Sequence, residues 1–90
     1  MSVLRERVAD AVERYIAQRL RDLGKPPASL VSSSDLFRDG VLDSVALTGL
    51  IAAVEADTAR EIDFIDVDPD ALGTFDGIVA ELTRAAEANP

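Results

Sequence analysis

Asp43 and Ser44, at the centre of the stretch DGVLDSV (residues 39–45), are the side chains whose types and spacing could do chemistry. Ser44 offers a hydroxyl nucleophile and Asp43 a carboxylate beside it. A serine hydrolase also needs a histidine to take the hydroxyl proton, and its nucleophile elbow has glycines around the serine. The chain has no histidine, and the residues around the serine read LDSVA. We therefore expect no catalytic triad and no enzymatic activity; an Asp-Ser pair is otherwise typical of a helix start.

A second polar group, Asp66, Asp68 and Asp70, has the alternating spacing with which a calcium loop begins. An EF-hand loop would also need glycine at position 71 and glutamate at position 77. The chain has Ala71 and Gly77 there, and it contains neither histidine nor cysteine. We expect no metal site and interpret the run as a solvated acidic loop that caps a short helix.

The elements that must position these residues are helices. Over residues 3–21, apolar side chains recur at steps of three and four, with Ser2 as a candidate N-cap and a Gly/Pro-rich stop from Gly24. The long connection over residues 24–43 carries too many apolar residues for a free linker, so we expect it to be pinned onto the core. These apolar residues are Leu30, Val31, Leu36, Phe37, Val41 and Leu42.

A second helix is predicted over residues 44–58, with Asp43 as its N-cap. The residues expected to face inward are Val45, Leu47, Leu50, Ile51 and Val54. Gly49 weakens this helix by about 1 kcal/mol relative to alanine. It therefore indicates either close packing or a surface that another molecule approaches.

The segment that follows is predicted to contain a short helix. Asp68 as N-cap and Pro69 at the first helical position predict a helix through Leu72. The apolar anchors expected in this segment are Ile62, Phe64 and Ile65.

A last helix should begin after Thr74, and residues 87–90 should form a frayed tail. The predicted fold class is all-α: a small four-helix bundle of three longer helices and one short helix. Its 90 residues are expected to form one domain, 1–90, with a core over about 3–86.

Composition and charge limit the classes of molecule that this chain is expected to bind. With 48% hydrophobic and 29% charged residues the chain should fold, and its net charge of −8 disfavours nucleic acid and anionic membranes. The N-terminal residues mix charged and apolar types, so we expect no signal peptide, no membrane helix and a cytoplasmic location. We also expect a monomer. Residues 35–90 hold three cations and thirteen carboxylates, which favours partners with a basic surface.

Taken together, these features resemble the acyl carrier protein family, the phosphopantetheine-binding carrier domains. The resemblance covers about residues 4–84, and its most specific part is DLFRDGVLDSVALTGLIAAVE, residues 35–55. It implies a discrete type II carrier in which Ser44 is the attachment point for a 4'-phosphopantetheine arm, transferred from coenzyme A by a phosphopantetheinyl transferase. The arm's thiol would hold an acyl or aminoacyl group as a thioester, for a loading ligase or transferase and for downstream synthase enzymes.

The resemblance also implies partner-recognition residues: Asp43, which matches the family's aspartate, Val45, which stands where leucine is usual, and further Leu42 and Glu55. By residue type alone, Leu42 and Val45 fit equally as core or rim residues. Typical fatty-acid carriers have several acidic residues along this helix, whereas here only Glu55 and Asp57 occur, both late. The usual glycine stop is also missing, because Ala59 stands in its place.

These departures favour a carrier of a dedicated pathway, such as polyketide, nonribosomal peptide or specialised lipid synthesis. Two alternatives stay open. One is the housekeeping fatty-acid carrier; the other, from a different class, is an unmodified helical adaptor that binds another protein.

Overall fold

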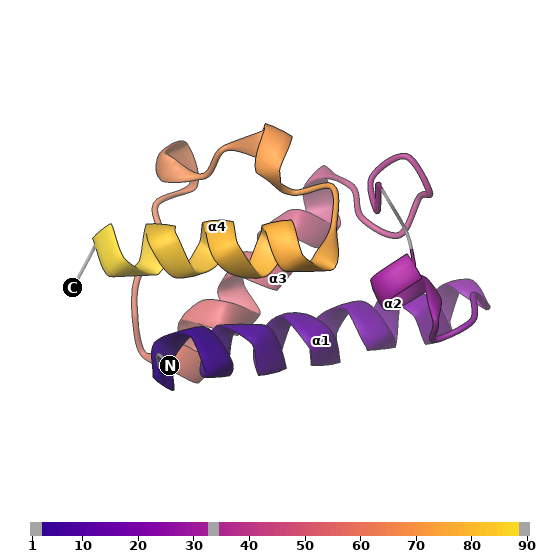
Figure 1. Cartoon of the computed structure of the whole chain (residues 1–90), viewed down its shortest axis with the longest axis horizontal. Coiled ribbons are helices and arrows are strands. Elements are labelled where there is room, and N and C mark those ends of the chain that lie inside the picture. Colours follow the sequence, from indigo (N-terminus) through magenta and orange to yellow (C-terminus); the bar gives the residue numbers. More distant parts are fainter. Residues whose placement is uncertain (1–2, 33–34, 89–90) are drawn as a thin grey trace.

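The computed structural model describes residues 3–32 and 35–88, and this part of the chain contains helices and no strand. The elements are α1 (Val3–Leu23), α2 (Ser29–Ser32), α3 (Ser44–Thr58), the 3₁₀ helices η1 (Phe64–Asp66) and η2 (Pro69–Ala71), and α4 (Phe75–Ala88) (Figure 1). The predicted all-α bundle is therefore confirmed, with α1, α3 and α4 as its longer helices. The candidate N-cap Ser2 lies outside the described residues.

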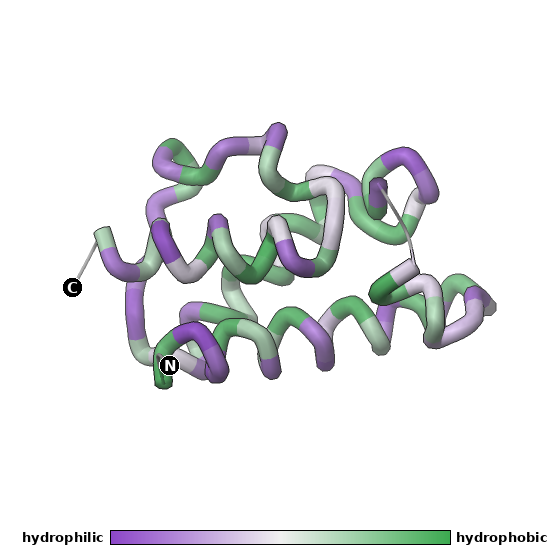
Figure 2. Tube along the Cα trace, in the orientation of Figure 1, coloured by the Kyte–Doolittle hydropathy of each residue, from purple (hydrophilic) through white to green (hydrophobic). Residues whose placement is uncertain are grey.

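Helix α1 is the element on which the others assemble. It packs against both α3 and α4, and α2 contacts it as well (Figure 1). Figure 2 shows apolar and polar residues alternating along α1 and α4, as expected for helices that bury one face, whereas α3 is apolar over most of its length. None of the helices in the described part is long and apolar enough to cross a bilayer.

The sequence does not predict α2, a single turn inside the first connection. It is closed by the backbone N–H groups of Val31 and Ser32, which donate to the carbonyl of Ala28 over 3.2 and 3.0 Å. Val31 points its side chain to solvent, so the prediction that it pins the connection is wrong. The fully buried residues of this connection lie later, at Leu36, Val41 and Leu42.

Helix α3 has its predicted bounds, but its inward face begins one residue later than predicted. Val45 is 82% exposed, whereas Ala46 and Leu47 are buried. Because successive residues turn by about 100° around a helix, Val45 lies on the side away from the stripe that starts at Ala46. The helix ends at Thr58, followed by Ala59 in the left-handed conformation with φ 55°.

The apolar anchors of the segment after α3 also differ from the prediction. Ile62 is buried as expected, but Phe64 and Ile65 are 56% and 89% exposed. Val67 and Leu72 are buried in their place. Asp63 caps η1 by accepting a hydrogen bond from the Ile65 N–H over 3.0 Å, and the resulting tight turn displays both apolar side chains.

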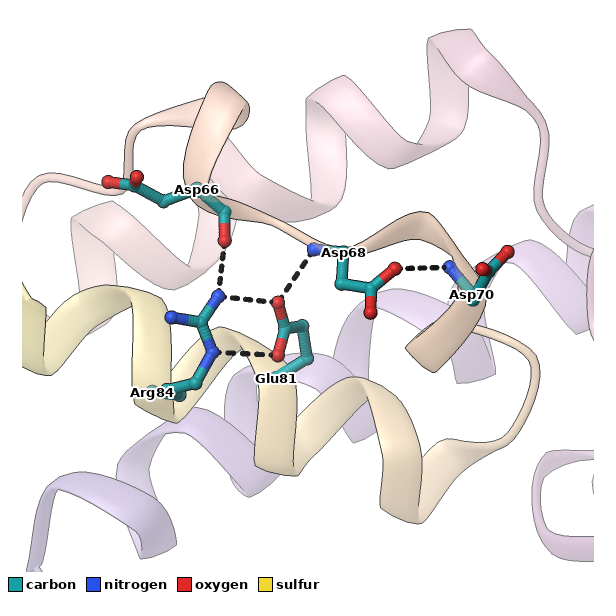
Figure 3. A network of polar contacts seen from close by, with 5 residues as sticks. All are labelled: Asp66, Asp68, Asp70, Glu81 and Arg84. Carbon is teal, nitrogen blue, oxygen red and sulfur yellow. Dashed lines mark hydrogen bonds and ion pairs between the residues drawn. The ribbon is translucent and has the colours of Figure 1, made fainter.

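A buried carboxylate ties this segment to α4 (Figure 3). Glu81 accepts the Asp68 N–H over 2.6 Å and two bonds from the Arg84 guanidinium at 2.9 and 2.7 Å. Arg84 also donates to the carbonyl of Asp66. The hydrogen bonds from Arg84 lower the pKa of Glu81, assisted by the Asp68 N–H, while burial acts in the opposite direction. We call Glu81, Arg84 and their two backbone partners the Glu81 network.

The predicted short helix and last helix are confirmed. Asp68 caps η2 with Pro69 at its start, and α4 begins directly after Thr74. Helix α4 continues to Ala88, so residues 87 and 88, assigned to a frayed tail, are helical. Residues 89 and 90 lie outside the described part.

Replacing Ala59 by glycine should stabilise the fold. A left-handed conformation is unfavourable for alanine and free for glycine, so Ala59→Gly should raise the free energy of unfolding by about 0.5–1 kcal/mol, after allowing for the greater freedom of glycine in the unfolded chain. Urea unfolding measures this. The matched control Ala56→Gly, inside α3, should instead lose about 1 kcal/mol. Equal losses in both variants would contradict the left-handed cap.

Glu81→Gln should lower stability in a pH-dependent way. A pKa lowered in the folded chain gives stabilisation that is present above the unfolded value of about 4.3 and is lost as pH falls through the folded value. The variant should therefore be less stable by roughly 1 kcal/mol at pH 7, with the difference shrinking towards pH 3. Urea unfolding at the two pH values checks this, and a difference independent of pH would count against the ion pair.

Candidate functional site

The residues DLFRDG before α3 form a single closed turn. The carboxylate of Asp35 accepts the N–H groups of Phe37 and Arg38, both over 3.1 Å. Gly40 has φ 78°, a conformation that glycine adopts without strain. This lets the Val41 N–H return to the Leu36 carbonyl over 2.9 Å, the bonding pattern that closes helix ends at a glycine. The Asp-Gly pair thus turns the chain towards α3.

This turn is fixed to the core on two sides. Leu36, Val41 and Leu42 are each at most 1% exposed. The Leu36 N–H donates to the Gly73 carbonyl over 2.7 Å, which joins the turn to the residues before α4. From α1, Arg19 donates through Nε to the Val41 carbonyl over 3.0 Å. The prediction of a pinned connection is confirmed for these residues.

Asp43 caps α3, as predicted. Its backbone is extended, and its Oδ1 accepts the Ala46 N–H over 2.7 Å. Its carbonyl accepts the Leu47 N–H over 2.8 Å, which starts the helical bonding. The Arg19 guanidinium lies 4.0 Å from the other carboxylate oxygen, at the outer limit of an ion pair. A long pair with an exposed carboxylate contributes little to stability, so the cap is the main role of Asp43 in the fold.

Ser44 is the first residue of α3 and is exposed to solvent. Its carbonyl accepts the Thr48 hydroxyl over 3.0 Å, within the helix. A hydroxyl at this place lies at the positive end of the helix dipole, which favours a negative group attached to it. With no histidine in the chain, the serine can receive a group but lacks the usual base to activate it.

The four predicted recognition residues do not form one surface. Asp43 and Val45 flank Ser44 and are exposed, so both are available to a partner. Leu42 is buried and offers no surface, so it is a core residue. Glu55 lies eleven residues along α3 from Ser44, about 16 Å at the rise of a helix. Its carboxylate accepts the Ile62 N–H over 2.9 Å, which gives it a structural role at the other end of α3.

Gly49 provides a close approach between α1 and α3. A Cβ atom at Gly49 would overlap the hydroxyl of Tyr15 and lie 3.2 Å from its Cζ. The glycine therefore leaves room for the Tyr15 ring. Of the two explanations for Gly49, this supports close helix packing and not a surface that another molecule approaches. Arg19 and Tyr15 were not singled out in the sequence, because on α1 they read only as parts of an amphipathic pattern.

In the acidic run after α3, the predicted capping role is confirmed at Asp68. Asp63 and Asp68 cap η1 and η2 through their carboxylates. In the described ranges, no group of three or more potential ligand side chains could hold a metal ion. A hollow of about 290 Å³ is lined by Glu55, Glu61, Ile62 and Asp63, and a second of about 190 Å³ by Val31, Thr74, Phe75 and Asp76. Ser44 lines neither of them.

Comparisons with protein-family models, with curated proteins and with solved structures found no significant match to this chain.

Two substitutions separate the capping role of Asp43 from its charge. Asp43→Ala removes the acceptor for the Ala46 N–H and should lower the free energy of unfolding by about 1 kcal/mol. Asp43→Asn keeps an acceptor of equal capping strength and should stay within a few tenths of a kcal/mol of the wild type. Thermal or urea unfolding measures both. A similar loss in the two variants would mean that the carboxylate charge, and not the cap, stabilises the start of α3.

Proposed function

We propose that this chain is a carrier protein that holds an acyl or aminoacyl group as a thioester on a 4'-phosphopantetheine arm attached to Ser44. The observation that carries the proposal is an exposed serine at the first position of α3, directly after a capping aspartate and a turn anchored in the core through Leu36, Val41 and Leu42. Supporting it are the all-helical fold and the likeness of residues 35–55 to carrier domains.

The surroundings of Ser44 suit a serine that is modified and does not itself catalyse. The N-terminal end of α3 stabilises a phosphodiester on the hydroxyl, and Arg19 offsets part of the neighbouring Asp43 charge. The chain has no cysteine or histidine, so the transferase supplies the base that takes the hydroxyl proton. The arm, once attached, supplies the thiol that carries the cargo.

The exposed side of α3 favours a carrier of a dedicated pathway over the housekeeping fatty-acid carrier. Beside Ser44 it presents Val45 and then small uncharged residues, with Ala52 exposed and Ala53 half-buried. Partners that recognise this side through shape and apolar contact need few basic residues there. A polyketide, nonribosomal peptide or specialised lipid enzyme with such a docking face is the partner class we propose.

Intact mass measures the modification directly. The folded protein is incubated with coenzyme A and a broad-specificity phosphopantetheinyl transferase, and we expect a gain of one phosphopantetheine group. Ser44→Ala should gain none. Ser32→Ala, which removes another exposed serine, should be modified as the wild type is.

Two results would overturn the carrier proposal. One is no mass gain in a wild-type protein whose circular dichroism shows folded helices. The other is a gain that persists in Ser44→Ala. The first result would favour the unmodified helical adaptor, and the second would place the arm on a residue other than Ser44.

A further inference from the structure

Two large apolar side chains stand on the surface of the segment after α3. Phe64 and Ile65 are neighbours on η1. Apolar residues that stand singly on a surface are ordinary, but an adjacent pair on a fixed turn, rimmed by charge, is typical of an interaction site. Glu61 and Asp63 precede the pair and Asp66 follows it.

A hollow with acidic walls begins directly before this pair. Glu55, Glu61, Ile62 and Asp63 line its volume of about 290 Å³. The Ile62 N–H holds the Glu55 carboxylate in place over 2.9 Å. Glu55, Glu61 and Asp63 place negative charge around this space, which suits the cationic head of an arginine or lysine.

The segment is held rigidly, which lowers the entropy cost of binding. Within η1, Asp63 accepts the Ile65 N–H through its side chain and the Asp66 N–H through its carbonyl over 2.9 Å. From α4, the Glu81 network holds the backbone of Asp66 and Asp68 (Figure 3). Arg84 pairs with Glu81 and also interacts electrostatically with Asp66 and Asp68, so its charge is shared among carboxylates on the α4 side of the segment.

Charge decides what kind of molecule covers this surface. Residues 61–70 contain five carboxylates and no cation. A nucleic acid, an anionic bilayer or a second copy of this chain, with its net charge of −8, would meet repulsion here. A protein that presents a cation beside an apolar depression meets attraction and buries both apolar side chains.

We propose that the acidic hollow together with Phe64 and Ile65 is a docking surface for a protein partner that inserts an arginine or lysine into the hollow and covers the apolar pair. This surface lies beyond the far end of α3 from Ser44. The proposal does not depend on modification of Ser44.

The test uses a defined probe: an amidated 16-residue amphipathic helical peptide with leucines on one face and arginines beside them. Titrated into the ¹⁵N-labelled protein, it should shift the backbone amide signals of residues 61–66 and those of the neighbouring part of α4. The dissociation constant should rise roughly fivefold or more for Ile65→Ser and for the double variant Glu61→Gln/Asp63→Asn. A peptide with glutamine for arginine should bind more weakly by a similar factor.

Matched controls remove the same chemistry elsewhere. Val31→Ser removes another exposed apolar side chain, and Glu13→Gln another exposed carboxylate on α1; both should change the dissociation constant by less than about twofold. Ser44→Ala should bind as the wild type does, which separates this proposal from the carrier function.

Three results would overturn the docking surface. One is a set of shifts that maps to α1 or to the start of α3. Another is equal weakening by the control variants, which would indicate general charge attraction. The third is concentration-dependent dimerisation of the wild type that Ile65→Ser abolishes, which would assign the surface to a second copy of this chain.

Discussion

Burial of Leu36, Val41 and Leu42 is the constraint on which the position of Ser44 depends. These side chains fix a turn whose backbone is bonded to α1 through Arg19 and to Gly73 before α4. Helix α3 therefore starts at a point set by the core, with Asp43 as its cap. A serine on a free linker would sample many positions, whereas here the hydroxyl keeps one relation to the bundle. Any enzyme that acts on Ser44 meets a preformed surface.

The two ends of α3 serve different tasks within the same packing scheme. At its start, a cap and a turn anchored in the core expose Ser44 beside Val45. Beyond its end, Glu55 and the Glu81 network hold a turn that exposes Phe64 and Ile65. Helix α1 supports both, because it packs against α3 and α4 together. Much of the small core thus holds irregular segments in place, and these segments position the exposed residues Ser44, Phe64 and Ile65.

The sequence was sufficient for the features set by local rules. The bounds of α3, its Asp43 cap, the Asp68-Pro69 start of η2 and the all-helical class follow from capping residues and from apolar periodicity. It failed where burial depends on helix rotation or on turn geometry: Val45, Phe64 and Ile65 are apolar by type and exposed by position. The long-range partners of Arg19, Tyr15 and Glu81 carry no sequence signal, because a polar residue on an amphipathic helix reads as solvated until its neighbour is known.

Hydrogen exchange at the turn before α3 tests most directly whether Ser44 is held by the core. Four amides report on this turn. The Leu36 N–H donates to the Gly73 carbonyl, and the Val41 and Leu42 N–H groups both donate to the Leu36 carbonyl. The Ala46 N–H donates to the Asp43 carboxylate. We predict that these four amides exchange as slowly as the amides inside α3, since both would open only when the bundle unfolds. Fast exchange at the turn beside a protected α3 would contradict the account, because Ser44 would then follow a mobile loop.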